Sequence, residues 1–207
     1  MPTLAERYHA SLASLRDACS QGLSLNWNGF DLGDLMLAEW IAEQIKPSAN
    51  KHLHGVALFK HQLHAWRQRK KMGSTSLSKD GDVLVFFTSQ NQWTNLQPIV
   101  HQLEQQGLKI LVLSTKPSLL ASIPSAHKRK ALLLGFKKTN FKAPIAHEMV
   151  SLIQRNLPKL NYLYHAIQPY LNNTQLNYVL IGNDNTSEGR LVAKLAQQKN
   201  IPTGSIQ

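Results

Sequence analysis

The pattern of apolar positions divides the chain into two parts with different periods. Before residue 73, apolar residues recur at three- and four-residue steps, which predicts amphipathic helices. These helices are expected at residues 3–20, 32–45 and 54–71. Asp31 is a suitable N-cap for the second helix, and residues 25–29 are expected to form a turn. We therefore predict an N-terminal α-helical region, residues 1–72, that contains no strand.

After a linker at residues 73–81, rich in Gly and Ser, short continuous apolar runs alternate with helical patterns. Such runs are typical of strands buried on both faces of a parallel sheet. The strands are expected at residues 82–88, 109–114, 131–134, 178–181 and 203–207. The helices are expected at residues 94–106, 116–123, 144–171 and 187–199. The third of these helices should kink or break near Pro158. The alternation predicts an α/β fold over residues 82–207, a Rossmann-like doubly wound parallel sheet of about five strands.

The chain is basic, and its charge is unevenly distributed. Its 207 residues include 23 Lys and Arg against 12 Asp and Glu, which gives a net charge of +11. Residues 1–43 hold six acids and two bases, a net of −4, so residues 44–207 carry +15. A strongly basic charge indicates anionic partners and says nothing about the fold.

Cysteine usage and apolar run lengths indicate the compartment. The single cysteine, Cys19, excludes a disulfide framework and a thiolate zinc site, and it indicates a reducing environment. The longest apolar runs, residues 83–87 and 131–135, are too short to cross a bilayer. Glu6 and Arg7 stand where a signal peptide would be apolar. We therefore expect a cytoplasmic protein, peripheral at the inner membrane if its basic surface meets anionic lipid.

A row of mostly polar residues follows the first predicted strand. They are Ser89, Gln90, Asn91, Gln92, Trp93, Thr94 and Asn95. In doubly wound sheets ligands bind beyond the carboxyl ends of the strands, and amides and hydroxyls suit a hydroxyl-rich or anionic ligand. The alternative is that Thr94 or Asn95 simply caps the next helix. The glycines of a dinucleotide-binding loop are missing here.

A second polar segment follows the fourth predicted strand. It contains Asn183, Asp184, Asn185 and Arg190. Asp184 is placed to orient a hydroxyl or to act as a base, and Arg190 to reach an anion or to pair with Asp184. The alternative is an Asn/Asp turn, capped by Thr186 or Ser187, with no ligand.

Two further clusters have structural as well as functional interpretations. Basic residues gather at positions 67–71 and 127–130, either as a solvated face or as an attraction for anionic headgroups or an anionic acceptor. Histidines gather at His52, His54, His61 and His64. No carboxylate or cysteine joins them, so exposed or hydrogen-bonded histidines are favoured over a metal site, and we predict neither metal nor cofactor.

Four pieces of the sequence carry a resemblance to a known family. They are residues 25–32, residues 86–98, Asn183 to Asn185 with Arg190, and residues 201–207. Together they resemble the N-terminal half of bacterial surface-polysaccharide glycosyltransferases of the GT-B type. The resemblance implies a first Rossmann-like domain that holds the acceptor, and a second that holds the nucleotide-sugar donor. It also implies that a His-Gly pair and the second domain follow Gln207 in relatives, so that this chain is a fragment without transfer activity of its own.

The resemblance further implies that residues 89–95 and the segment from Asn183 to Arg190 line the cleft between the domains. Asp184 is then the candidate base, and helix N-termini face the leaving diphosphate. The implied partners are a nucleotide-sugar donor and a glycan or lipid-linked acceptor. Two other functions stay open: a sugar-nucleotide epimerase or binding domain of the same architecture, and a nucleic-acid-binding module, for which no motif is present. No second carboxylate lies near Asp184, which disfavours a paired-carboxylate hydrolase.

Overall fold

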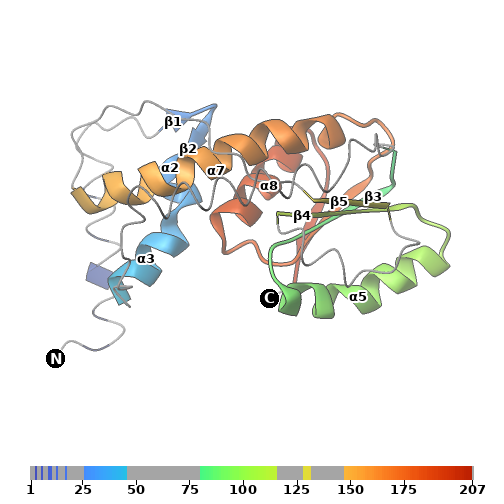
Figure 1. The fold of residues 1–207 in the computed structure, drawn as a ribbon, viewed down its shortest axis with the longest axis horizontal. Coiled ribbons are helices and arrows are strands. Elements are labelled where there is room, and N and C mark those ends of the chain that lie inside the picture. Colours follow the sequence, from blue (N-terminus) through green and yellow to red (C-terminus); the bar gives the residue numbers. More distant parts are fainter. Residues whose placement is uncertain are drawn as a thin grey trace, which may run out of the picture.

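A computed structural model of the protein shows an α/β architecture (Figure 1). The structure describes residues 26–45, 80–115, 128–131 and 147–206, together with positions 3, 6, 9, 10, 13 and 17. The predicted helix at 54–71, the linker at 73–79 and the helix at 116–123 lie outside these residues. Of the predicted helix at 3–20, the described positions 6, 9, 10, 13 and 17 are helical.

Parallel strands form the centre of the molecule. They are β3 (Val83–Phe87), β4 (Ile110–Ser114), β6 (Tyr178–Ile181) and β7 (Thr203–Ser205), and β3 pairs with both β4 and β6. Every residue of β3 and β4 is buried, as their continuous apolar sequences predict. The parallel α/β sheet expected from the sequence is confirmed, and its arrangement is compatible with a Rossmann-like fold.

The third of the predicted strands, counted along the chain, was placed wrongly. We expected it at residues 131–134, whereas β5 (Lys128–Ala131) pairs in parallel with β4. Part of the basic stretch at 127–130 is therefore strand backbone. Among the described strands, β5 stands at the end of the order β5-β4-β3-β6-β7. Lysines and an arginine are compatible with that position, because edge strands commonly carry charge.

Helices lie on both faces of the sheet (Figure 1). On one face lies α5 (Gln90–Gln105), and on the other lie α7 (His147–Leu171) and α8 (Ser187–Gln198). Because side chains alternate along a strand, β3 contributes to two separate cores. Leu84 and Phe86 belong to the α7/α8 core, while the neighbouring valines of β3 belong to the α5 core.

Two helix boundaries differ from the predicted ones. The helix α5 begins at Gln90, four residues earlier than expected, because Ser89 caps it by accepting a hydrogen bond from the Gln92 N–H. The predicted break near Pro158 is wrong, since α7 continues through it. Leu157 and Leu160 are buried on either side of the proline, so packing holds both halves of the helix against the core.

The N-terminal segment contains a hairpin that the sequence analysis missed. β1 (Asn26–Trp27) pairs antiparallel with β2 (Phe30–Asp31) across Asn28 and Gly29, which have positive φ angles of 50° and 81°. Asn-Gly with both residues in this region is the preferred two-residue hairpin turn, so the expectation of a strand-free region was wrong.

The predicted helix at 32–45 is split in two. α2 (Leu32–Leu35) is followed by Met36 and then by α3 (Leu37–Ile45). The expected cap is confirmed, because the Asp31 carboxylate accepts hydrogen bonds from the backbone N–H groups of Gly33 (2.7 Å) and Asp34 (3.2 Å). Leu32, Leu35 and Met36 are fully buried in the α7/α8 core, so this segment packs on the helical side of the sheet.

Candidate functional site

The winding of the sheet brings the two predicted polar segments together. The chain runs outward from β3 to β4 and β5, then returns to β6 and β7 on the other side of β3. The order therefore reverses between β3 and β6, the point at which open α/β sheets bind ligands. The Gly182 N–H, directly after β6, donates to the Phe86 carbonyl of β3 (2.8 Å). The segments that follow β3 and β6 consequently leave the sheet side by side.

A glycine permits this close approach. A Cβ at Gly182 would lie 2.8 Å from the Cβ of Gln92, which is closer than real Cβ atoms come. The Gln92 side chain is itself fixed, because its Oε1 accepts hydrogen bonds from the Thr88 N–H (2.7 Å) and the Thr88 hydroxyl (3.3 Å). Thus Gln92 holds the turn after β3 and forms the contact with the end of β6.

Most of the first predicted segment belongs to the beginning of α5 rather than to a loop. Trp93 is only 2% exposed, and its ring centroid lies 5.2 Å from that of Phe87, so it is a core residue. Neither Thr94 nor Asn95 caps the helix, because Ser89 does, and the Thr94 hydroxyl donates to the Gln90 carbonyl (3.1 Å). The side chains that stay exposed at this end of α5 are Gln90, Asn91, Thr94 and Asn95.

The segment after β6 is a tight turn into α8. The Asn183 Oδ1 accepts a hydrogen bond from the Asn185 N–H (2.7 Å), and Thr186 caps α8 through the Gly189 N–H (3.1 Å). A Cβ at Gly189 would lie 1.9 Å from the Asn183 carbonyl oxygen. The turn therefore packs directly on the helix backbone, which fixes the neighbouring Asp184.

Arg190 connects this turn to the N-terminal segment. Its Nε donates to the Asp184 carbonyl oxygen (3.3 Å), and its Nη1 donates to the Asp34 carbonyl oxygen (2.7 Å). The Asp34 carboxylate lies 3.6 Å from the same Nη1 and 2.6 Å from the Lys194 Nζ. Arg190 thus binds the main chain of Asp184, and its guanidinium joins two elements of the protein at the rim of the site.

Glu39 is a residue of the site that sequence reasoning missed. Its Oε1 accepts a hydrogen bond from the Ser187 N–H (2.6 Å), across 148 residues of sequence. The next residue, Glu188, is buried, forms an ion pair with Lys159 and accepts a hydrogen bond from the Ser187 hydroxyl (3.1 Å). The amino end of α8 therefore already holds a carboxylate. The available signal was the acidic character of residues 1–43 beside a basic body.

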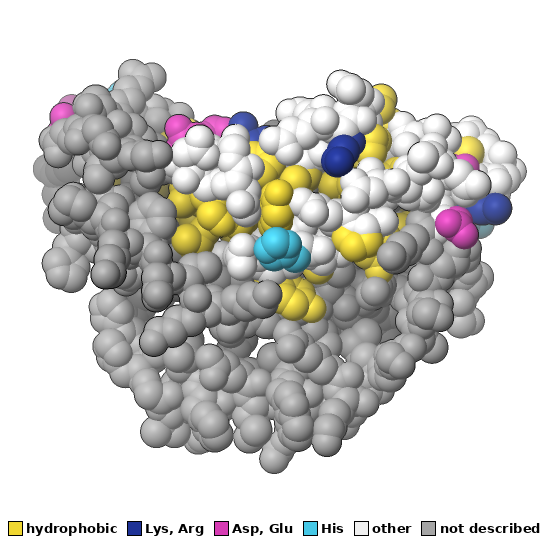
Figure 2. Space-filling model, turned by 90° about the horizontal axis from the view of Figure 1, so that it is seen from above, with side chains coloured by type: hydrophobic (Ala, Val, Ile, Leu, Met, Phe, Trp, Pro, Cys, Tyr) yellow, Lys and Arg dark blue, Asp and Glu magenta, His cyan; other side chains and the backbone are white. Residues whose placement is uncertain are grey.

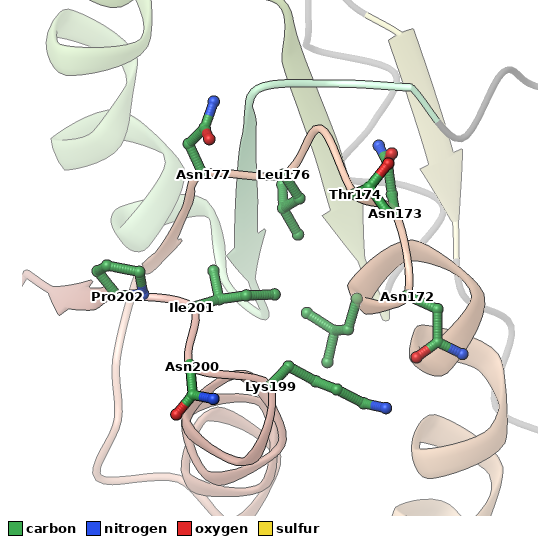
Figure 3. A pocket seen from close by; sticks show the side chains of 10 residues that line it. Asn172, Asn173, Thr174, Leu176, Asn177, Lys199, Asn200, Ile201 and Pro202 are labelled. Atoms are coloured by element: carbon green, nitrogen blue, oxygen red, sulfur yellow. The ribbon is translucent and has the colours of Figure 1, made fainter.

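A hollow lies at the amino ends of the strands, at the opposite end of the sheet from the candidate site (Figure 3). It has a volume of about 660 Å³ between the ends of α7 and α8 and the starts of β6 and β7. Leu176 and Ile201 point into it, and the asparagines around it are Asn172, Asn173, Asn177 and Asn200. Since ligands of open α/β sheets bind at the carboxyl ends of the strands, this hollow is not part of the candidate site.

Basic residues are under-represented in the part of the chain that the structure describes. Nine of the 23 Lys and Arg lie in it, together with all 12 Asp and Glu, and most of the described residues visible in Figure 2 are uncharged. Within the same residues no group of three or more His, Cys, Asp or Glu is arranged to hold a metal ion. The four clustered histidines and the basic residues at 67–71 lie outside them. None of the described helices is both long and apolar enough to cross a membrane.

Comparison with known proteins identifies no relative, since no protein family, no curated protein and no solved structure matches this chain.

Proposed function

We propose that residues 82–207 act as the acceptor-side domain of a GT-B glycosyltransferase. In this proposal a sugar passes from a nucleotide-sugar donor to a glycan or lipid-linked acceptor during synthesis of a cell-surface polysaccharide. The observation that carries it is that two polar segments, Ser89–Asn95 and Asn183–Arg190, lie side by side at the carboxyl ends of β3 and β6. Sites in open α/β sheets lie at this point, and the resemblance noted in the sequence involves both segments.

The exposed groups at this rim suit a carbohydrate. Gln90, Asn91 and Asn95 present side-chain amides, and Asn185 presents a further one across the rim. An amide offers both a donor and an acceptor, as does a sugar hydroxyl, so a row of amides can bind several hydroxyls without carrying charge. We therefore assign the exposed start of α5 to the acceptor glycan.

The amino end of α8 favours an acceptor role over a donor role. Helix N-termini bind phosphates well, because their N–H groups are free and the helix dipole favours negative charge. Here the Glu39 carboxylate accepts a hydrogen bond from the Ser187 N–H, so a diphosphate that bound at this helix end would have to displace this carboxylate. We assign the donor diphosphate to the second domain that the resemblance implies, facing the amino end of α5.

Asp184 is the proposed base. Its carboxylate takes the proton of the acceptor hydroxyl while that oxygen bonds to the anomeric carbon of the donor, whose bond to the diphosphate breaks. Arg190 is a positioning residue in this scheme, since its guanidinium already binds Asp34 and the Asp184 carbonyl. We further propose a cytoplasmic protein at the inner membrane, where a lipid-linked acceptor would be presented.

A titration followed by ¹H–¹⁵N NMR tests the proposal. Surface-glycan fragments should shift the amide signals of Asn91, Asn95 and Asn185, whereas nucleotide sugars should leave them in place. In a longer protein that includes the second domain, calorimetry should detect nucleotide-sugar binding, and its absence would contradict the proposal. Consumption of the nucleotide sugar with no acceptor present would indicate an epimerase instead. A salt-dependent shift of a random oligonucleotide would indicate nucleic-acid binding.

A further inference from the structure

The hollow at the amino ends of the strands has the size and the lining of a small-molecule site (Figure 3). Its volume of about 660 Å³ falls within the range of ligand pockets, about 300–1,000 Å³. Leu171, Leu176 and Ile201 are buried and form an apolar floor, whereas the side chains around this floor are mainly amides. An apolar surface bordered by a few polar groups is the usual composition of a ligand pocket.

Hydrogen bonds hold the backbone on both sides of the hollow. After α7, the Asn173 Oδ1 accepts a hydrogen bond from the Gln175 N–H (3.0 Å), and the Asn173 carbonyl accepts one from the Leu176 N–H (3.2 Å). After α8, the Ala196 carbonyl accepts a hydrogen bond from the Ile201 N–H (3.0 Å). Because both segments are fixed, a ligand meets a hollow that is already formed, and binding does not have to order it.

Several polar side chains at the hollow are available to a ligand. Within the described part of the chain, the side chains of Asn172, Thr174, Asn177 and Asn200 form no hydrogen bond. Each of these amides and the hydroxyl can both donate and accept. The same is true of a sugar hydroxyl, so these groups suit a ligand that carries several hydroxyls.

The charges around the hollow disfavour ions. Among the described residues that line it, Lys199 is the one charged side chain, and Figure 3 shows it extending from the end of α8 towards Asn172. Both α7 and α8 end here, and the carbonyl groups at a helix C-terminus carry partial negative charge, which repels an anion. The lysine repels a metal ion, and the same lining contains no carboxylate to bind one and no aromatic ring on which a nucleobase could stack.

We propose that this hollow binds a neutral sugar unit of a glycan, at the far end of the sheet from the candidate site. The apolar floor contacts the C–H face of the sugar ring, and the amides and the Lys199 ammonium bind its hydroxyls. The proposal does not rest on the proposed transferase activity, because the hollow shares no residue with the segments Ser89–Asn95 and Asn183–Arg190.

Titration of the isotope-labelled chain with maltose, lactose and N,N′-diacetylchitobiose tests the proposal. In ¹H–¹⁵N spectra, at least one of these neutral disaccharides should shift the amide signals of residues 172–177 and 199–201 to saturation at millimolar concentration. Inorganic phosphate and glucuronate should bind more weakly. Asn172→Ala should weaken sugar binding about 2–10-fold, because one hydrogen bond is lost. Lys199→Met, which keeps the apolar stem, should weaken it similarly.

Gln198→Ala is the matched control. It removes an exposed amide from the last turn of α8 that does not line the hollow, and it should bind sugar as the wild type does. Circular dichroism should show the same helix content in all variants. The proposal would be overturned if none of the three disaccharides shifted these signals, or if phosphate or glucuronate bound more tightly than all of them. Wild-type affinity in both Asn172→Ala and Lys199→Met would also overturn it.

Discussion

The carboxylate of Glu39 in α3 accepts a 2.6 Å hydrogen bond from the backbone N–H of Ser187, the first residue of α8. A side chain 148 residues away thus performs the function that a local cap normally performs, and it does so beside the true cap, Thr186. The N-terminal segment and the α/β sheet are joined through this bond.

Replacing Glu39 by Ala should lower the free energy of unfolding by about 1–2 kcal/mol, because the Ser187 N–H loses a charged acceptor. Urea denaturation followed by circular dichroism measures the change. Gln102→Ala, at an exposed position of α5, should alter stability by less than about 0.5 kcal/mol. Equal stability of the two variants would show that the Glu39 contact contributes nothing.

Replacing Gly189 by Ala should destabilise the protein by about 3 kcal/mol or more, since the new Cβ would lie 1.9 Å from the Asn183 carbonyl oxygen. Gly107→Ala is the comparison, because nothing lies within 4 Å of its added Cβ and only its φ of +82° opposes the change. That conformational cost is about 1–2 kcal/mol. In thermal melts the melting temperature of Gly189→Ala should therefore be well below that of Gly107→Ala. The reverse order would contradict the packing of the turn on α8.

Glu6 should titrate below its ordinary pKa. The backbone N–H of Thr3 donates to its carboxylate (2.6 Å), and so does the Thr3 hydroxyl (2.9 Å); both bonds lower the pKa of Glu6. Since the folded pKa is depressed, this contribution to stability is present above the unfolded pKa and is lost as the pH falls through the folded pKa. NMR titration of the Glu6 carboxyl carbon measures the midpoint. Thr3→Ala should raise it part of the way, because the backbone bond remains, and an unchanged midpoint would exclude the hydroxyl contribution.

In a longer protein with the second domain, Asp184→Asn should lower the rate of sugar transfer by about 100-fold or more while acceptor binding is retained, because the proposed base is lost. Asn185→Ala, at the next position of the same turn, should weaken acceptor binding with a smaller effect on turnover. Transfer assays at saturating donor separate the two effects. Full activity in Asp184→Asn would restrict Asp184 to a structural role in the turn.

The sequence predicted the sheet well and the boundaries less well. Strands β3, β4 and β6 are continuous apolar runs, and such runs identify buried parallel strands directly. The start of α5 was misplaced because Ser89 and the polar residues after it are equally compatible with a loop and with a capped first turn. β5 was misplaced because charged residues at a sheet edge carry no apolar signal.

Within the candidate site, the sequence pointed to the two segments, but it gave neither the strand order that brings them together nor the partners of individual side chains. Arg190 was expected to reach an anion or to pair with Asp184; its guanidinium binds the main-chain oxygens of Asp184 and Asp34 and lies 3.6 Å from the Asp34 carboxylate. The contact between Glu39 and Ser187 depends on tertiary folding over 148 residues. No local pattern in the chain specifies such a pair.

The burial of α2 against α8 has a consequence for the protein while it is being made. Leu32, Leu35 and Met36 are fully buried, and α2 packs on α8, which is synthesised about 150 residues later. At ribosomal rates of about 5–20 residues per second, these side chains wait roughly 7–30 s for their partner surface. The nascent chain therefore exposes an apolar stretch from the outset, and chaperones that bind such stretches should bind this segment until α8 leaves the ribosome.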